Sequence, residues 1–485
     1  MRKNKYSKRK RYAQQSNPLH EPVLSFSPQD HWSLKDSFEG TLIMGTTGSG
    51  KTTGPGSTLA RQFLRFGLGG LVLTAKPDEV DLWRNYCART GRLDDLIIME
   101  PGSEYRFNYL DFIGRTQIGP GTGLAMNVAD VIYQVAKTGG HGTGQGDAFW
   151  QGEQTKIMLA PIETLLLTGD KLTSQAIYDI VISAPPSDER LQSEDWRNDS
   201  ACYQALLRIR KRIDNGELTE DEIEDYRNLE NYWFYEYCNL HEKTRGIVVS
   251  MFTSFFTEFI RRPNRKLFCT DTTITPEVCF EGKIIVVNLP VRTYHKVGVM
   301  AQKLMKLMFQ RTAEQADKNG TVRLPAFLWC DEFQTVAYDY DREFLATARS
   351  SAVASVFLSQ NLPNIYEAFG GQQVGENKAK ALLANLNTKF FLANDDPITN
   401  TYAAELIGQK IYWRKNKGSS VGKEVNFSRG ENQVFDHAVR PEDFHHLRNG
   451  GPKNLYQVEA YAVQTSRLFM ASGSNVLKTI FDQTR

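Results

Sequence analysis

GTTGSGKT, residues 45–52, is the stretch that decides the fold expected for this chain. It follows the apolar run TLIM at residues 41–44 and precedes a segment that can form a helix. The order of strand, glycine-rich loop and helix is the context that a phosphate-binding P-loop requires, and a chance turn seldom carries the complete GxxxxGK[ST] pattern in that context. The sequence therefore predicts that the chain binds a nucleoside triphosphate.

Each residue type in this loop has a chemical reason to be there. The glycines let the backbone turn tightly and point N–H groups at phosphate oxygens, Lys51 reaches the β and γ phosphates, and the Thr52 hydroxyl can ligate Mg²⁺. Pro55 falls where the following helix should continue, and it predicts a kink or an early bend. The residues expected to hold ATP are Gly45, Thr46, Thr47, Gly48, Ser49, Gly50, Lys51, Thr52 and Thr53.

A second apolar run, AFLWC at residues 326–330, ends in two carboxylates. Asp331 is expected to hold the hydration shell of Mg²⁺, and Glu332 is expected to orient and deprotonate the attacking water. An isolated run of this kind is more often a buried strand with a solvated acidic end. Its pairing with the P-loop favours hydrolysis rather than binding alone.

A third apolar run, ASVFLS at residues 354–359, leads directly into Gln360. In P-loop motors the neighbouring strand often ends in a polar residue that senses the γ-phosphate, so Gln360 is the sensor candidate. The alternative, an amide that caps a loop after a strand, carries equal weight.

Length and composition indicate a folded protein of about three domains, because 485 residues with 41% hydrophobic side chains can bury sizeable cores. The six cysteines show no metal-binding spacing, which predicts thiols in a reducing cytosol and no zinc. No uninterrupted apolar run reaches the roughly 18 residues that a membrane helix needs. We therefore expect a soluble, cytoplasmic protein.

The start of the chain is strongly basic, with seven Lys or Arg residues among its first eleven and no apolar core behind them. This pattern excludes a signal peptide and predicts a disordered basic arm over residues 1–30. Such an arm commonly touches nucleic acid or anionic lipid, and a solvated tail without a specific partner is an equally good interpretation.

Strand-like runs alternate with helical segments along most of the chain, which predicts an α/β fold with a mostly parallel sheet. Residues 127–276 instead show helical periodicity, including a capping box from Thr219 to Glu222, and predict an inserted all-α domain. The other expected strands are residues 70–74, 96–99, 283–289 and 389–393.

Three further segments are candidates for contact with phosphate or nucleic acid. The glycine-rich residues 139–146 predict a flexible loop rather than a second phosphate cradle, since no lysine follows. The aromatic residues 233–235 near the basic residues 208–212 could stack bases, although core packing is the favoured interpretation. Residues 413–429 are basic and rich in Ser and Gly, and they predict a mobile loop that is the better candidate for a nucleic-acid contact.

Several stretches taken together resemble the TraG/TraD-like coupling proteins of type IV secretion and conjugation, within the FtsK/HerA superfamily of P-loop DNA-translocating ATPases. The resemblance extends from the P-loop to near the end of the chain, and its specificity lies in the order and spacing of the motifs. They are LVLTAKPDEV (71–80), FNYLDF (107–112), AFWQGE (148–153), EKTRGIVVSMFTSFF (242–256), EGKIIVVNLPV (281–291), LSQNLPNI (358–365), LLANLNTKFFLANDDPITNTYAAELIG (382–408) and VRPEDFHHL (439–447).

The resemblance implies a RecA-like ATPase domain formed by residues 31–126 and 277–485, with the all-α domain inserted at 127–276. It also implies six-membered rings around DNA, with ATP bound between subunits and the helical domain facing the cargo. Carried over by position, Lys51 and Thr52 match the phosphate and magnesium residues. The hydrolysis pair matches Asp331 and Glu332, and the sensor matches Gln360.

Ring ATPases complete the site with a cation from the neighbouring subunit, because charge develops on the transferring phosphoryl group. Arg349, expected on the helix between the second and third apolar runs, is the candidate, and Arg342 and Lys389 are its rivals. Three departures limit the resemblance, one of them the Pro55 described above. This chain has no membrane helices of the kind that dock such proteins on a secretion channel, and Ala75 precedes Lys76 where the family commonly has Asp.

The leading functional hypothesis is an ATP-driven DNA motor that grips phosphates without reading bases and moves DNA, or a nucleoprotein, in conjugation or secretion. An alternative is a nucleotide-gated platform that recruits a relaxase or another protein. A third is a soluble ring that serves viral genome packaging or anti-phage defence. A small-molecule kinase fits least, since Glu332 beside Asp331 suits activation of water.

Overall fold

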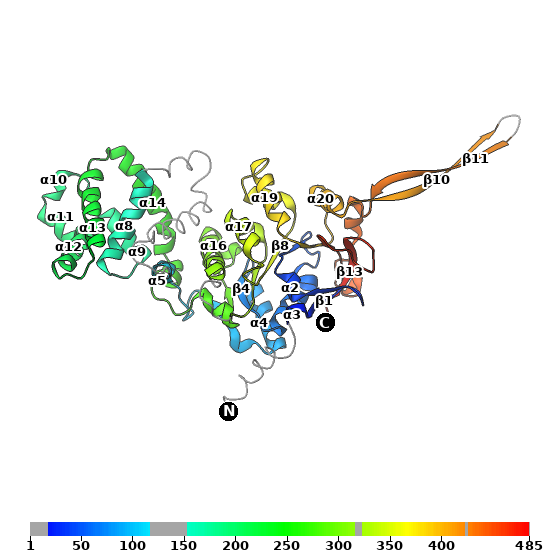
Figure 1. Cartoon of the computed structure of the whole chain (residues 1–485), viewed down its shortest axis with the longest axis horizontal. Helices are drawn as coiled ribbons and strands as arrows, with labels where there is room; N and C mark the ends of the chain where they lie inside the picture. Colours follow the sequence, from blue (N-terminus) through cyan, green and yellow to red (C-terminus); the bar gives the residue numbers. More distant parts are fainter. Residues whose placement is uncertain (1–17, 117–152, 316–322, 422–424, 485) are drawn as a thin grey trace, which may run out of the picture.

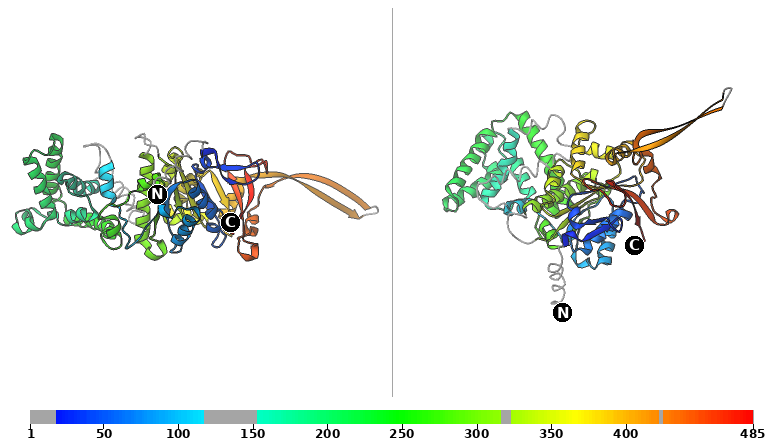
Figure 2. Two further views of the ribbon diagram at one scale, coloured as in Figure 1. Left: turned by 90° about the horizontal axis from the view of Figure 1, so that it is seen from below. Right: turned by 45° about the vertical axis from the view of Figure 1, so that its right-hand side comes forward.

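The computed structural model describes residues 18–116, 153–315, 323–421 and 425–484. The basic residues 1–17 and the glycine-rich residues 139–146 lie outside the described residues. The molecule is elongated (Figure 1): a helical body lies at one end, a large sheet with its helices lies in the middle, and a two-stranded ribbon projects from the other end. The two views of Figure 2 agree on this order.

The middle of the molecule is a nine-stranded sheet with the order β13-β12-β9-β3-β8-β7-β4-β6-β5. Seven neighbouring strands are parallel, and β12 and β13 add an antiparallel edge. The parallel strands are β3 (Thr41–Met44), β4 (Gly69–Leu73), β5 (Leu96–Met99), β6 (Ile284–Val287), β7 (Ala326–Cys330), β8 (Val353–Ser359) and β9 (Thr388–Phe391). Every strand predicted from the sequence is present, and the predicted α/β fold with a mostly parallel sheet is confirmed.

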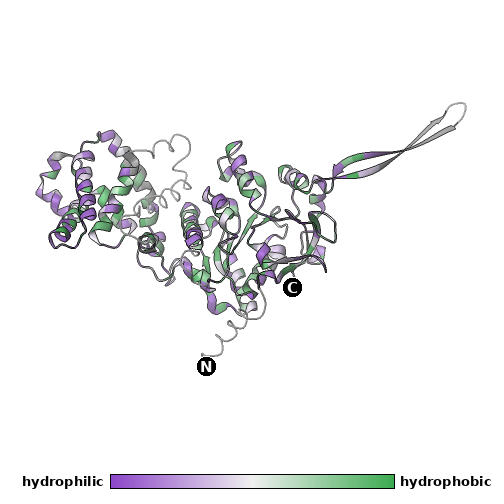
Figure 3. Cartoon of the chain, in the orientation of Figure 1, coloured by the Kyte–Doolittle hydropathy of each residue, from purple (hydrophilic) through white to green (hydrophobic). Residues whose placement is uncertain are grey.

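Continuous apolar strands are needed here because helices cover both faces of the sheet. On one face α3 (Ser57–Arg65) and α4 (Glu79–Thr90) pack on a core that includes Phe327 and Val356. On the other face α16 (Val291–Gln315), which is kinked by non-helical backbone at His295, packs on alternate residues of the same strands. Figure 3 shows apolar residues along the strands in the middle of the molecule and a mixture of apolar and polar residues on the surrounding helices.

The antiparallel edge was not anticipated. It is formed by β12 (Gln457–Gln464), which pairs with β9, and by β13 (Val476–Asp482), which is the outermost strand. The start of the described chain also differs from the predicted arm, since residues 22–25 form β1 (Pro22–Ser25), paired with β2 (His31–Ser33). Trp32 anchors this hairpin, because its buried indole donates a hydrogen bond of 3.0 Å to the Thr388 hydroxyl.

The helical body runs from α8 (Glu153–Thr168) to α15 (Asn264–Phe268), and no strand interrupts it among the described residues from 153 to 276. The predicted capping box is present: Thr219 and Glu222 bond reciprocally at the start of α13 (Glu220–Asn231). Trp233 is fully buried and its indole donates to Thr164, which confirms the core-packing interpretation for this residue. The domain boundary at residue 127 falls outside the described residues and stays a prediction.

The ribbon corrects one expectation. Residues 413–429 are not a mobile loop, because the described part of them belongs to β10 (Gln409–Val421) and β11 (Val425–His437), which form a continuous antiparallel ladder. The base of the ribbon pairs Ile411 with Phe435, a combination typical of strands. Farther out, the Lys, Asn, Gly and Ser residues of β10 have low strand propensity. For this reason the sequence did not predict the two strands of the ribbon.

Candidate functional site

Three neighbouring strands, β3, β8 and β7, end at the same edge of the sheet. The P-loop follows β3, the acidic pair follows β7, and Gln360 follows β8. The carboxyl edge of a parallel sheet is where ligands bind in folds of this class. Segments separated by nearly three hundred residues therefore line one cleft of about 190 Å³. Its walls are Thr47, Gly48, Gly50, Lys51, Thr52, Thr53, Lys76, Asp331, Glu332, Asn449 and Gln483.

The P-loop backbone has the geometry that its glycines permit. Gly48 and Gly50 have φ of +78° and +89°, which side-chain-bearing residues rarely adopt. Gly50 also lies so close to β12 that an added Cβ would stand 2.6 Å from Val458. The Lys51 ammonium donates to the carbonyl oxygens of Gly45 (2.6 Å) and Thr46 (3.1 Å), so it is held against the loop at the mouth of the cleft.

The bend predicted at Pro55 is present. Thr52–Gly56 forms a single π-helical turn before α3 begins at Ser57. Gly56 N–H bonds the carbonyl of Lys51 at 2.9 Å, across the position where proline cannot donate. The widened turn lets the helix start directly behind the phosphate loop.

The two residues expected to hold the metal lie together. The Thr52 hydroxyl is 3.3 Å from an Asp331 carboxylate oxygen. A hydroxyl and a carboxylate at this spacing fit Mg²⁺, which takes oxygen ligands, keeps several waters and is usually bound by one or two protein groups with the substrate phosphates. Consistent with so sparse a site, the described residues contain no cluster of three or more His, Cys, Asp or Glu that could hold a metal by themselves.

Glu332 occupies a constrained position. Its backbone is left-handed, with φ 49° and ψ 52°, and the residue is 7% exposed. The carboxylate accepts hydrogen bonds from the Gln360 amide at 2.9 and 3.1 Å and from the Gln334 amide at 2.7 Å. Strain of this kind at a cleft residue persists only where the surroundings enforce it.

The charged groups in and around the cleft change one another's pKa values. Burial raises the pKa of Asp331, and the positive charge of Lys76 opposes that rise. Burial lowers the pKa of Lys51, and the charges of Glu332 and Asp331 oppose this change. Burial, and then the Asp331 charge, raise the pKa of Glu79 to about 9. A divalent cation and a triphosphate would compensate charges that this protein otherwise buries at a cost.

Sequence reasoning missed four residues of this site. Gln334 holds Glu332, and Lys76 lines the cleft with its ammonium 4.0 Å from a Glu332 oxygen. Asn449 and Gln483 lie beside the P-loop, next to the antiparallel strands β12 and β13. The Gln483 amide donates to the Thr53 hydroxyl at 2.6 Å. Only Lys76 had a signal in the sequence, since it lies in the turn after β4.

The structure does not bring Arg349 into its own cleft. It lies just past α17 (Tyr340–Thr347) in the turn that leads into β8, which is the opposite edge of the sheet. Its side chain is 61% exposed, and its guanidinium pairs with Glu39 at 3.2 Å. Of its rivals, Arg342 is exposed on α17, whereas Lys389 is buried in β9, where burial lowers its pKa to about 8.

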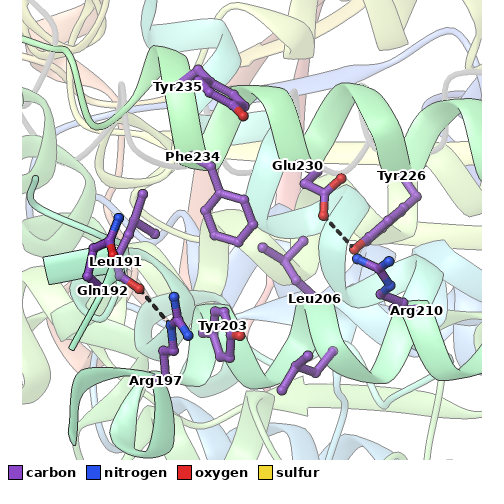
Figure 4. Close-up of a pocket in the computed structure, with 11 residues that line it drawn as sticks. Leu191, Gln192, Arg197, Tyr203, Leu206, Arg210, Tyr226, Glu230, Phe234 and Tyr235 are labelled. Carbon is purple, nitrogen blue, oxygen red and sulfur yellow. Dashed lines mark hydrogen bonds between the residues drawn. The ribbon is translucent and has the colours of Figure 1, made fainter. Parts of the chain in front are cut away.

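A larger groove of about 470 Å³ lies in the helical body (Figure 4). It separates α12 (Ala201–Asp214) from α13 and the turn after it, and it is lined by aromatic, aliphatic and arginine side chains. The Arg197 guanidinium lies 5.6 Å from the centre of the Tyr203 ring, and the Tyr226 hydroxyl donates to Glu230. Neither the P-loop residues nor Asp331 and Glu332 line this groove.

Comparison with known proteins agrees with this architecture. A family model described as the TraM recognition site of TraD and TraG matches residues 325–448, which contain Asp331, Glu332 and Gln360. A search of the curated proteins finds no match for the chain.

Solved structures of a coupling protein share the whole fold. The unbound form of the bacterial conjugative coupling protein TrwBdeltaN70 matches with a TM-score of 0.59 at 14% identity, over 99% of this chain and 92% of that chain. TrwB in complex with the ATP analogue ADPNP matches with a TM-score of 0.59 at 14% identity, and TrwB in complex with ADP and Mg²⁺ with 0.58 at 13%, over the same shares. At identities this low the likeness establishes the fold.

Residues 325–448 are similar to a segment of TraD and TraG, and the whole chain is similar in fold to TrwB. The resemblance predicted from the sequence is confirmed by the family match in its carboxyl-terminal part and by a fold shared along its full length. The expected RecA-like sheet with additional helices is likewise confirmed. Within the part of the chain that the structure describes, no helix is both long and apolar enough to cross a membrane.

Proposed function

We propose that this TraG/TraD-like chain is an ATPase that uses hydrolysis to move DNA, or a nucleoprotein, in conjugation or secretion. The observation that carries the proposal is the convergence of Lys51, Thr52, Asp331 and Glu332 on one cleft. The fold shared with TrwB, which has been crystallised with an ATP analogue and with ADP and Mg²⁺, supports ATP and Mg²⁺ as the ligands of this cleft.

The residues divide the chemistry of hydrolysis between them. The P-loop N–H groups and Lys51 bind the phosphates and offset the charge that develops in the transition state. Thr52 and Asp331 would hold Mg²⁺, which neutralises charge on the β and γ phosphates. Glu332 orients a water and takes its proton while the water oxygen bonds to the γ-phosphorus. The bond from that phosphorus to the bridging oxygen breaks, and ADP leaves with the electron pair.

DNA as the cargo rests on the likeness to coupling proteins and on general physical grounds. A motor that tracks any sequence must grip phosphates rather than bases, so binding should weaken steeply with salt. The proposed assembly is a homo-hexamer that places Arg349 of one subunit at the cleft of the next. The match to a TraM recognition segment supports a protein partner, such as a relaxase-associated protein, for residues 325–448.

The direct test is the ATPase rate of the purified protein with and without DNA at low salt. The proposal expects stimulation by DNA of any sequence, and a progressive loss of that stimulation between 50 and 200 mM salt, as counterion release requires. An ATPase rate that DNA does not change would remove the motor. Lack of ATP turnover under any of these conditions would remove the enzyme as well.

A second function is a nucleotide-gated platform that recruits a protein. The groove of Figure 4 favours it, because partly exposed aromatic rings beside arginines are typical of protein interfaces. A platform would hydrolyse ATP slowly and without regard to DNA. Displacement of a protein roadblock bound to DNA separates the two functions, since only a motor clears it.

A further inference from the structure

Gln334 lies two residues beyond Glu332, in the short 3-10 turn Phe333–Thr335 that follows the acidic pair. Its amide N–H donates to a Glu332 carboxylate oxygen at 2.7 Å, the shortest hydrogen bond recorded to that carboxylate. No motif in the sequence assigned it a role. A side chain that holds the proposed base directly can control where that base points.

The other end of the Gln334 side chain is also fixed. Its amide oxygen accepts a hydrogen bond of 2.8 Å from the Ser359 hydroxyl. Ser359 is the last residue of β8 and is fully buried, and its backbone carbonyl accepts the N–H of Gly45, the first residue of the P-loop, at 3.3 Å. One chain of hydrogen bonds therefore runs from the phosphate loop, through Ser359 and Gln334, to Glu332.

We propose that Gln334 is a positioning residue, which holds the Glu332 carboxylate at a fixed orientation relative to the P-loop. The proposal rests on the proposed hydrolytic function. Glu332 has a second amide partner in Gln360, but Gln360 follows β8 in a connecting segment and is the candidate γ-phosphate sensor. Gln334 is the donor whose opposite end is anchored to a buried strand residue.

Orientation matters here because a general base must meet its water within hydrogen-bond reach, and small misplacements are costly. A carboxylate offers about four acceptor positions. The two amides occupy some of them, so the water must use the remaining ones. Loss of the Gln334 amide would leave the Glu332 carboxylate held by Gln360 and by the more distant Lys76 ammonium, and free to populate orientations that do not face the phosphate.

The test uses the full-length protein and Gln334→Met, which keeps the length of the side chain and removes the amide. We expect kcat for ATP to fall about tenfold or more, the range seen when supporting hydrogen bonds of a site are removed. KM for ATP should stay within about twofold, because the phosphate contacts are unchanged. Gln372→Met, which alters an exposed glutamine, is the matched control and should behave as the parent.

A double-mutant cycle separates positioning from general destabilisation. Ser359→Ala removes the anchor and should lower kcat by a smaller factor. The double variant should be no slower than Gln334→Met alone, because both substitutions break the same chain. Fully additive losses, or a kcat for Gln334→Met equal to that of the control, would overturn the proposal.

Failure of this inference is distinguishable from failure of the function. If Glu332→Gln abolishes turnover while Gln334→Met does not change it, the function stands and the inference falls. If the parent protein does not turn over ATP, the function falls. If Glu332→Gln leaves turnover intact, Glu332 loses its role as the base. A crystal structure of Gln334→Met then decides the inference without reference to activity: a displaced Glu332 carboxylate supports it, and an unmoved one overturns it.

Discussion

The two edges of the central sheet differ in how their charged side chains are buried and paired. At the carboxyl edge, Lys51, Asp331 and Glu332 are 8%, 5% and 7% exposed, and they lie around one cleft. At the amino edge, Arg349 is exposed and paired with Glu39, whereas Lys389 is buried, donates to the Leu386 carbonyl and has no charged partner among the described residues. Burying a charge is costly unless it is compensated. The charges at the carboxyl edge therefore lie close enough to compensate one another, whereas burial of Lys389 carries a cost that no neighbouring charge offsets among the described residues.

The largest effect is expected from Lys51→Ala at the carboxyl edge. Without the ammonium, both ATP binding and turnover should become undetectable, since the loss of a single charge-stabilising donor already costs about a hundredfold or more. Equilibrium binding of a fluorescent ATP analogue and steady-state turnover measure the two effects. Lys211→Ala, an exposed lysine in the helical body, is the control and should match the parent. Equal binding in both variants would contradict the role of Lys51.

Glu332→Gln should separate binding from chemistry at the same edge. The amide cannot take a proton from water, so turnover should fall by about 10²–10⁴, the usual contribution of a general base. ATP should still bind and should accumulate on the protein, because Lys51 and Thr52 are untouched. Isolation of the protein with intact ATP after gel filtration checks this. Recovery of ADP at the parental rate would remove Glu332 from its role.

Arg349→Ala tests whether the amino edge contributes to the cleft of another subunit. A cation supplied in trans should be worth about a hundredfold in turnover or more. Mixing Arg349→Ala with Lys51→Ala should restore part of the activity, because some mixed interfaces contain an intact half from each variant. Arg227→Ala, at an exposed arginine of the helical body, is the control, and Arg342→Ala tests the rival candidate. If Arg349→Ala turns over ATP at the parental rate, Arg349 does not act in the cleft of a neighbouring subunit, and its pairing with Glu39 is structural.

Lys389→Met should change stability rather than turnover. Burial lowers the pKa of Lys389 from 10.5 to about 8. Below pH 8 the folded chain carries the full cost of the buried charge. Between pH 8 and 10.5 the unfolded chain binds more protons than the folded one, so the parent gains stability as pH rises. The variant should therefore be more stable than the parent at pH 7, by up to about 3 kcal/mol.

That advantage of Lys389→Met should shrink as the pH approaches 10. Urea unfolding of parent and variant at pH 7 and pH 9.5 measures it, with the exposed Lys453→Met as the control. A stability difference that is the same at both pH values would show that the buried charge of Lys389 is not its cause.

The sequence predicted the carboxyl edge well because its signals are local. The P-loop has a fixed spacing, and each parallel strand is a short apolar run, so β3, β7 and β8 could be placed and their ends expected to meet. Parallel strands that follow one another through helices must present their carboxyl ends at the same edge, which is why Lys51 and Asp331 could be paired without a structure.

The features that the sequence did not predict depend on contacts between residues far apart in the chain. β12 and β13 bring Gln483 to Thr53, a contact that no spacing encodes. The proposed role of Gln334 depends on the hydrogen bond that it accepts from Ser359, at the end of β8. The ribbon β10–β11 was hidden because polar and glycine residues occupy strand positions outside the core, where hydrophobic periodicity carries no information.

The central claim is that the P-loop and the acidic pair act on one triphosphate. A crystal structure of the full chain with a non-hydrolysable ATP analogue and Mg²⁺ tests it most directly. The account predicts the γ-phosphate in contact with the Lys51 ammonium, the metal beside Thr52 and Asp331, and the Glu332 carboxylate facing the γ-phosphate across one water. A nucleotide bound away from this cleft, or Glu332 directed away from the γ-phosphate, would contradict it.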